Sequence, residues 1–151
     1  MPDVEVVPGE VAQIVESVFD SMLRLEVSQC AEPWRPGTGR MIATVHLSGA
    51  WNGSVALECD LRQAREFTRR YLSNAGPAVS DVVAADLLGE LANMIGGNWK
   101  CVLGRGLHLS APEVAAGDFA EWSVRAGRVV EQLSFLSPEG VFWITILVRH
   151  V

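Results

Sequence analysis

The sequence feature that most constrains the fold is the proline-free stretch from Asp81 to Leu103. Its apolar residues recur at helical spacing, and Ser80 or Asp81 stands where a helix N-cap is expected. The apolar positions are Leu87, Leu88, Leu91, Ile95, Trp99 and Val102. A second stripe consists of small residues that would let another backbone pack closely: Ala85, Gly89, Ala92 and Gly96. The pattern predicts one long helix over 81–103.

A polar face of this helix, at about 100° per residue, carries Asp86, Glu90, Asn93 and Gly97. Outward polar residues are ordinary on helices, so one interpretation is a solvated face. The other is a partner-binding face, because asparagine disfavours helix interiors. Glycine costs about 0.5–1 kcal/mol relative to alanine there. The adjacent pair Gly96-Gly97 would leave the helix surface bare beside Glu90 and Asn93.

The segment from Glu90 to Asn98, Glu-Leu-Ala-Asn-Met-Ile-Gly-Gly-Asn, resembles the signature of the CheC/CheX/FliY chemotaxis phosphatases. The order of predicted helices and strands also resembles that family over nearly the whole chain. Near the N-terminus Glu10 and Gln13 share the i, i+3 spacing but lack the rest of the signature. The resemblance is therefore closest to the CheX-like members with a single motif.

This resemblance implies an enzyme that removes phosphate from the aspartate of a CheY-like response-regulator receiver domain. Asn93 would orient the hydrolytic water, and Glu90 would pair with the receiver's active-site lysine. Asp86, Gly96 and Gly97 are candidate partner-binding residues. No cofactor or metal of the chain's own is implied, because magnesium would belong to the receiver, and a homodimer is expected. The alternative is a non-catalytic receiver-binding or dimeric adaptor module.

The composition restricts the other function classes. A length of 151 residues predicts a single domain over 1–151. The formal net charge of -6 argues against a nucleic-acid partner, which requires a basic surface. The N-terminus has no signal-peptide core, and the longest apolar run, Val141–Val148, is too short to cross a bilayer. We expect a cytoplasmic protein without a membrane segment.

The cysteines and histidines do not form a recognisable metal or disulfide pattern. Cys30, Cys59 and Cys101 contain no Cys-x-x-Cys pair, and we expect Cys59 and Cys101 to be buried, reduced thiols. The three histidines lie far apart on predicted strands: His46, His108 and His150. No P-loop or Gly-x-Ser-x-Gly elbow is present in the sequence.

The remaining pattern predicts an α+β fold, with an antiparallel sheet of about six strands and three helices packed against it. Two further helices are expected over 9–25 and 61–72. Strands are expected over 40–47, 54–58, 107–111, 121–126, 129–136 and 141–150, with loops over 27–39 and around 112–117. Tyr71 is expected to point inward, and the arginines of 61–72 form either a solvated face or a phosphate or partner site. The run 141–148 is either a central strand or an edge that pairs with a second copy.

Overall fold

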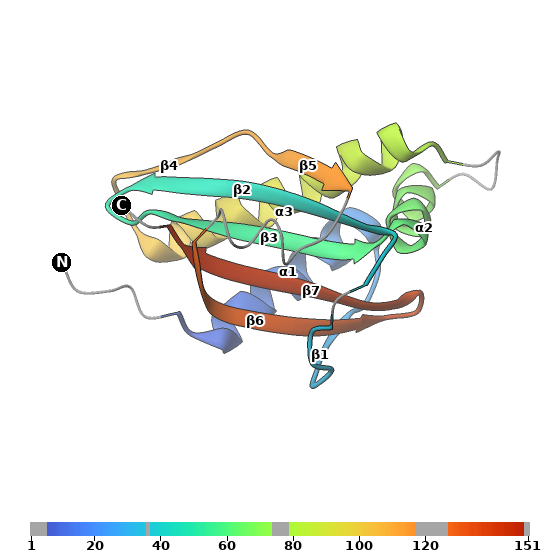
Figure 1. Ribbon diagram of the computed structural model, residues 1–151, viewed down its shortest axis with the longest axis horizontal. Coiled ribbons are helices and arrows are strands. Elements are labelled where there is room, and N and C mark those ends of the chain that lie inside the picture. The colour runs from blue at the N-terminus through green and yellow to red at the C-terminus, as the bar shows by residue number, and fades with distance from the viewer. Residues whose placement is uncertain (1–5, 36, 74–78, 117–126, 150–151) are drawn as a thin grey trace.

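The computed structural model describes residues 6–35, 37–73, 79–116 and 127–149. These residues form three helices and a seven-stranded sheet (Figure 1). The helices are α1 (Pro8–Leu23), α2 (Leu61–Leu72) and α3 (Asp81–Leu103). The strands are β1 (Ser28–Cys30), β2 (Arg40–Gly49), β3 (Gly53–Asp60), β4 (Leu107–Leu109), β5 (Glu113–Ala116), β6 (Arg128–Ser137) and β7 (Gly140–Val148).

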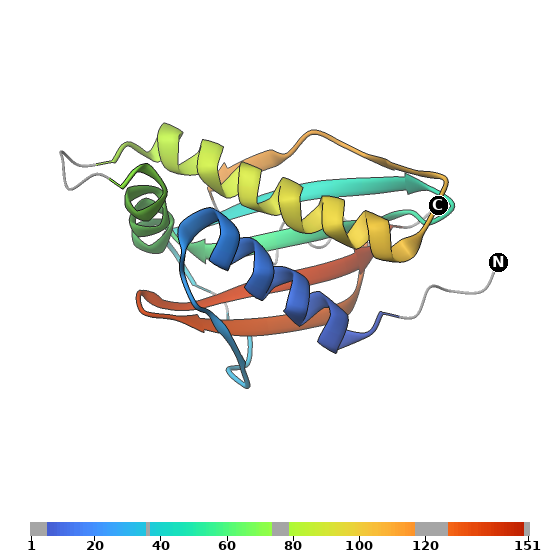
Figure 2. The same ribbon diagram turned by 180° about the vertical axis from the view of Figure 1, so that it is seen from behind.

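The sheet has the strand order β1-β6-β7-β3-β2-β4, and β5 also pairs with β2. Every pairing among the described residues is antiparallel. Helices α1 and α3 lie side by side on one face of this sheet, while α2 lies at its end (Figure 2). The long helix α3 therefore packs against the sheet on one side and against α1 on another, and its remaining side is covered by neither.

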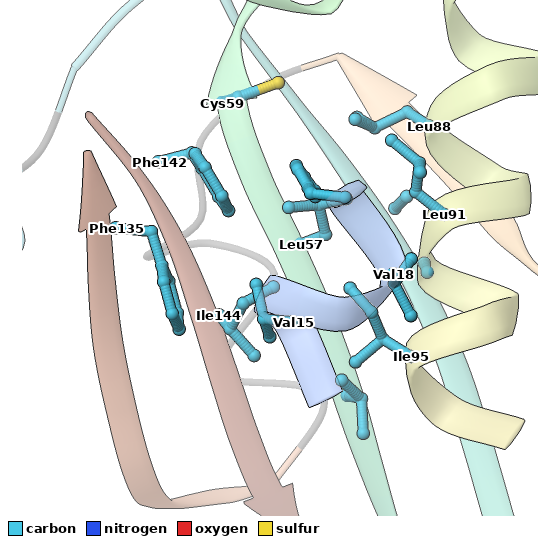
Figure 3. Packing of buried hydrophobic residues seen from close by; sticks show 14 of the residues in the cluster. Val15, Val18, Leu57, Cys59, Leu88, Leu91, Ile95, Phe135, Phe142 and Ile144 are labelled. Carbon is cyan, nitrogen blue, oxygen red and sulfur yellow. The ribbon is translucent and has the colours of Figure 1, made fainter. Parts of the chain in front are cut away.

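The core fills the space between the sheet and the helices. Alternate residues of the central strands point toward α1 and α3, as the two-residue period of a strand requires (Figure 3). The labelled core residues come from both helices and from β3, β6 and β7: Val15, Val18, Leu57, Cys59, Leu88, Leu91, Ile95, Phe135, Phe142 and Ile144. Burial of one large apolar side chain stabilises the fold by about 1.5–3 kcal/mol. Packing on this core, more than helix propensity, therefore holds α3 in place.

A charged cluster is buried on the opposite face of the sheet. The Arg40 Nη1 atom lies 3.0 Å from Glu58 Oε2, and the guanidinium lies 4.7 Å from the centroid of the Trp143 ring. The Trp34 indole donates a hydrogen bond of 2.8 Å to the other Glu58 oxygen. Because Glu58 is paired and almost completely buried, its carboxylate is a structural group.

The predicted α+β class with three helices and a largely antiparallel sheet is confirmed. In the described residues the sheet has seven strands rather than about six: five of the predicted strands form, and two short strands form where loops were expected. Strand β1 lies within 27–39 and pairs with β6, and β5 lies within 112–117 and pairs with β2. Segments this short carry no detectable alternation, so only pairing with a neighbour defines them. The predicted strand 121–126 and His150 lie outside the described residues.

Strand β7 lies between β6 and β3, in the interior of the sheet. The interpretation of 141–148 as a central strand is confirmed, and its interpretation as an edge that pairs with a second copy is wrong. Tyr71, which was expected to point inward, is exposed, and so is Val102 at the end of the apolar stripe of α3. Both lie in the last turn of their helices. The apolar period of the sequence continues there, but the packing that covers the earlier turns does not.

The three cysteines are free thiols. Cys59 is completely buried, and this burial, helped by the neighbouring carboxylates of Asp60 and Glu58, raises the pKa of the Cys59 thiol far above its ordinary value. Cys101 is exposed on α3, which corrects the prediction that it is buried. Cys101 lies outside the stripe of α3 residues that packs against the core.

We expect the two thiols to react with a disulfide reagent at very different rates near pH 8. In the variant Cys30→Ser/Cys101→Ser, Cys59 should react at least about 100-fold more slowly than Cys101 does in Cys30→Ser/Cys59→Ser, because the thiolate is the reactive form. Spectrophotometric thiol titration measures both rates. Full labelling of Cys59 in urea is the control, and rapid labelling in the native protein would contradict its burial.

Candidate functional site

Helix α3 is one continuous helix of 23 residues, about 34 Å long. Ser80 caps its start, because the Val83 N–H donates a hydrogen bond of 3.3 Å to the Ser80 hydroxyl oxygen. The helix ends at Gly104, whose φ of 104° lies in the region that favours glycine. The predicted bounds of 81–103 are confirmed. Both ends are therefore defined locally, and the surfaces along the helix have fixed directions.

The small-residue side of α3 packs against the sheet and its edge. A Cβ atom at Gly96 would lie 2.5 Å from Cγ2 of Val45 on β2, and 3.2 Å from Cδ1 of Leu109. At Gly89 it would lie 3.2 Å from Cγ2 of Val114 on β5. The predicted close packing on this stripe is confirmed, and the neighbour is the chain's own sheet. Gly96 is buried there, which corrects its place among the predicted partner-binding residues.

The polar side of α3 faces away from the core. Asp86 and Glu90 are exposed, and Asn93 and Gly97 are half-buried. Successive members of this set are three or four residues apart, so they follow one side of the helix at steps of about 4.5–6 Å. The structure thus brings the predicted Glu90–Asn93 pair together on one accessible surface, with Gly97 one turn further along.

The two amides of the motif differ in their hydrogen bonds. The Asn98 Nδ2 atom donates a bond of 2.8 Å to the Met94 carbonyl oxygen, within the same helix. No hydrogen bond joins the Asn93 side chain to another residue of the described part of the chain. Its amide therefore keeps both a donor and an acceptor for a water molecule or a ligand.

The charges of α2 and α3 also differ in their partners. Arg65 lies 2.7 Å from Asp81, Arg70 lies 2.8 Å from Glu139, and the Arg62 side chain donates to the Glu139 carbonyl oxygen. Arg69 pairs with Glu66. These contacts favour a structural role for the arginine face over a phosphate site. By contrast, within the described ranges neither Asp86 nor Glu90 takes part in an ion pair.

Two hollows lie beside the motif. One has a volume of about 300 Å³ and is lined by Glu90 and Asp86 together with Met22, Tyr71 and Leu72. The other, about 210 Å³, lies between the start of α1 and the end of α3 and includes Glu10, Gln13 and Asn98. The sequence pattern did not predict the first hollow, because the period of α2 puts Tyr71 on the same side as the buried Phe67.

His46, Ser54 and Glu113 form one other contact, which resembles a catalytic arrangement of serine, histidine and a carboxylate. The His46 Nδ1 atom lies 2.6 Å from the Ser54 hydroxyl oxygen, and its Nε2 atom lies 3.7 Å from a Glu113 oxygen. Ser54 is completely buried, so no substrate reaches this hydroxyl, and the contact serves to satisfy a buried polar group.

The part of the chain that the structure describes contains no group of three or more histidine, cysteine, aspartate or glutamate residues arranged to hold a metal ion. None of its helices combines the length and the apolar composition that a membrane span requires.

The solved structures that share this fold include several chemotaxis proteins. CheX from Vibrio vulnificus has a TM-score of 0.74 at 22% identity, over 93% of this chain and 97% of that one. CheX from Desulfovibrio desulfuricans has a TM-score of 0.71 at 18% identity, over 93% and 97% of the two chains. A chain of the CheX–CheY–BeF3–Mg complex from Borrelia burgdorferi has a TM-score of 0.71 at 21% identity, over 94% and 97%. The fold is that of the CheX and CheC-like chemotaxis proteins.

The family comparison is more specific than the fold. The model of the chemotaxis phosphatase CheX family matches residues 41–135, which are more than half of the chain and include all of α3. The chain belongs to the CheX chemotaxis phosphatase family. A search of curated protein sequences finds no match.

Substitution by alanine should change the stability of the protein in opposite directions at the neighbouring glycines Gly96 and Gly97. Gly96→Ala forces a methyl group against the stiff, buried Val45 side chain, and overpacking of this kind costs about 1–3 kcal/mol. Gly97→Ala meets nothing nearer than 3.9 Å and gains up to about 1 kcal/mol of helix propensity. Urea denaturation should show a lower midpoint for the first variant and an equal or higher one for the second. A stabilised Gly96→Ala protein would contradict the close contact with β2.

Proposed function

We propose that this CheX-family protein hydrolyses the aspartyl phosphate of a phosphorylated, CheY-like receiver domain, with Asn93 and Glu90 as its functional side chains. Family membership supports the phosphatase activity. One observation carries the assignment to residues. Glu90 and Asn93 lie one helical turn apart on an accessible face, and the Asn93 amide has no hydrogen-bond partner among the described residues.

The proposed reaction needs little chemistry from the protein. An aspartyl phosphate is an activated acyl phosphate, so positioning a water molecule in line with the phosphorus is the main requirement. An amide suits this task because it donates and accepts hydrogen bonds without titrating. Asn93 is half-buried on a helix held by the core, and this position restricts its motion before a substrate binds.

Glu90 has the complementary role of docking. Its exposed carboxylate is available to the active-site lysine of the receiver, and Asp86 extends the acidic face by one turn. Gly97 has no side chain, so the helix surface beyond Asn93 stays low. Packing does not require a glycine there, because a methyl group at this position would meet nothing nearer than Leu109, at 3.9 Å. We assign Asp86 and Gly97 to the contact surface and leave out the buried Gly96.

No cofactor of the chain's own takes part in the proposed reaction. The Borrelia burgdorferi complex contains CheX, CheY, beryllofluoride and magnesium, and we assign the magnesium to the receiver. The chain would act in the cytoplasm on this partner. The expected homodimer stays a prediction, and it does not form by edge-to-edge pairing of β7, because both edges of that strand are paired within the chain.

Asn93→Ala should abolish accelerated dephosphorylation while the protein stays folded. Removing the water-positioning amide should lower the rate constant at saturating receiver by about 100-fold or more. Stability should change by less than about 0.5 kcal/mol, as is usual for a surface position. Loss of radiolabelled phosphate from receivers of the same genome measures the rate. Gln13→Ala, which removes an exposed amide from α1, is the control. An Asn93→Ala protein with full activity on its receiver would exclude this role.

Glu90→Gln should weaken docking more than it slows hydrolysis. The change removes a charge and keeps the size of the side chain, so we expect KM to rise about tenfold and to depend less on salt concentration. Glu16→Gln makes the same charge change on α1 and should leave KM within about twofold. Equal KM values for Glu90→Gln and wild type would count against the lysine pairing. If wild type binds the receiver without hastening phosphate loss, the adaptor alternative holds instead.

A further inference from the structure

We propose that the hollow between α1, α2 and α3 binds a long basic side chain, a lysine or arginine, of the receiver domain. This site is distinct from the pairing of Glu90 with the active-site lysine, and it would add a second point of recognition. The inference rests on the proposed function, because it takes a receiver domain as the partner.

The shape of the hollow suits one extended side chain. Its volume is about 300 Å³, and its walls come from the end of α1, the last turn of α2 and the first turns of α3. The lining residues that a partner would meet are Met22, Tyr71, Leu72, Val83, Asp86 and Glu90. In Figure 2 the start of α3 lies next to α2 and the end of α1, at one end of the helical layer.

The walls of the hollow are apolar and accessible. Tyr71 and Leu72 are each 49% exposed, and Val83 is 42% exposed. Large apolar side chains gathered at one surface point mark a site of interaction more often than scattered ones do. Here they adjoin Glu90, so a partner seated on the Glu90–Asn93 pair would cover them as well.

Two carboxylates give the hollow its charge. Asp86 and Glu90 lie one turn apart on α3, where like charges repel and destabilise a helix. No ion pair within the described ranges relieves this repulsion. The nearby arginines of α2 are engaged elsewhere, Arg65 with Asp81 and Arg70 with Glu139. In the docked complex Glu90 would pair with the active-site lysine, so Asp86 is the carboxylate that stays available for a second cation at the hollow.

The combination of apolar walls and the unpaired carboxylate of Asp86 determines which side chain fits the hollow. Lysine and arginine carry an apolar stem and a charged end, and they bury the stem along apolar surface while the charge stays at a polar rim. An acidic side chain would be repelled, and a purely apolar one would leave Asp86 without a partner. Asp86 lies about 10 Å from Asn93 along the helix axis, within one ordinary protein–protein interface.

The neighbouring residues Val82 and Val83 allow a matched test. Both belong to the first turn of α3, but only Val83 lines the hollow, while Val82 is 73% exposed outside it. Val83→Lys places a positive charge in the hollow, and Val82→Lys makes the same change of net charge beside it. Val83→Glu replaces the same side chain with the opposite charge. Because the cap at Ser80 uses the backbone N–H of residue 83, all three variants keep it, and thermal melting checks their folding.

The measurement is binding of receiver domains from the same genome, charged with beryllofluoride and Mg²⁺, by calorimetry. We expect Val83→Lys to raise Kd at least tenfold, and Val82→Lys and Val83→Glu to change it less than threefold. Equal losses from Val83→Lys and Val82→Lys would overturn the hollow as a contact site. Equal losses from Val83→Lys and Val83→Glu would overturn the basic occupant.

The same series separates this inference from the proposed function. If wild type binds and dephosphorylates a receiver but Val83→Lys binds normally, only the second contact is wrong. If wild type neither binds nor dephosphorylates any of these receivers, the proposed function fails and the inference fails with it. Asn93→Ala tested in parallel should keep its affinity, because the hollow and Glu90 are intact in that variant.

Discussion

The close contact between the small-residue side of α3 and the sheet is the interaction on which the site depends. Gly96 against Val45 and Gly89 against Val114 bring the helix to the sheet, while Leu91 is buried in the core. A helix held on two sides cannot rotate about its axis. Its third side therefore has a fixed direction, and the Glu90–Asn93 pair faces outward as a consequence of packing elsewhere.

This arrangement explains how a helix with unfavourable residues remains intact. Asparagine and glycine lower helix propensity, yet α3 runs without a break between its cap at Ser80 and its end at Gly104. Core burial offsets the loss at Gly96, where no larger residue fits. At Gly97 packing gives no such reason, because the space beside it is open. A glycine at position 97 therefore serves to keep the helix surface free of a side chain, which agrees with its place in the proposed contact area.

Some charged side chains of the protein form ion pairs within the fold, and others face the solvent. Arg40 and the arginines of α2 are engaged within the fold. Asp81 at the start of α3 pairs with Arg65. The other exposed carboxylates of α1 and α3, in contrast, have no ion pair within the described ranges; they are Glu10, Glu16, Asp20, Asp86 and Glu90. The helical side thus carries negative charge that a basic partner surface can neutralise, and such a field also speeds encounter with that partner.

The sequence alone determined the long helix and its motif, because an N-cap, a 3.6-residue period and a terminal glycine are local signals. It also distinguished the polar face from the apolar one. Only tertiary structure decided which glycine of the adjacent pair is buried, since the two differ in what lies opposite them. Likewise, the exposure of Tyr71, the central place of β7 and the short strands β1 and β5 depend on neighbours distant in sequence. Periodicity describes one element at a time and therefore cannot specify the partners against which its faces pack.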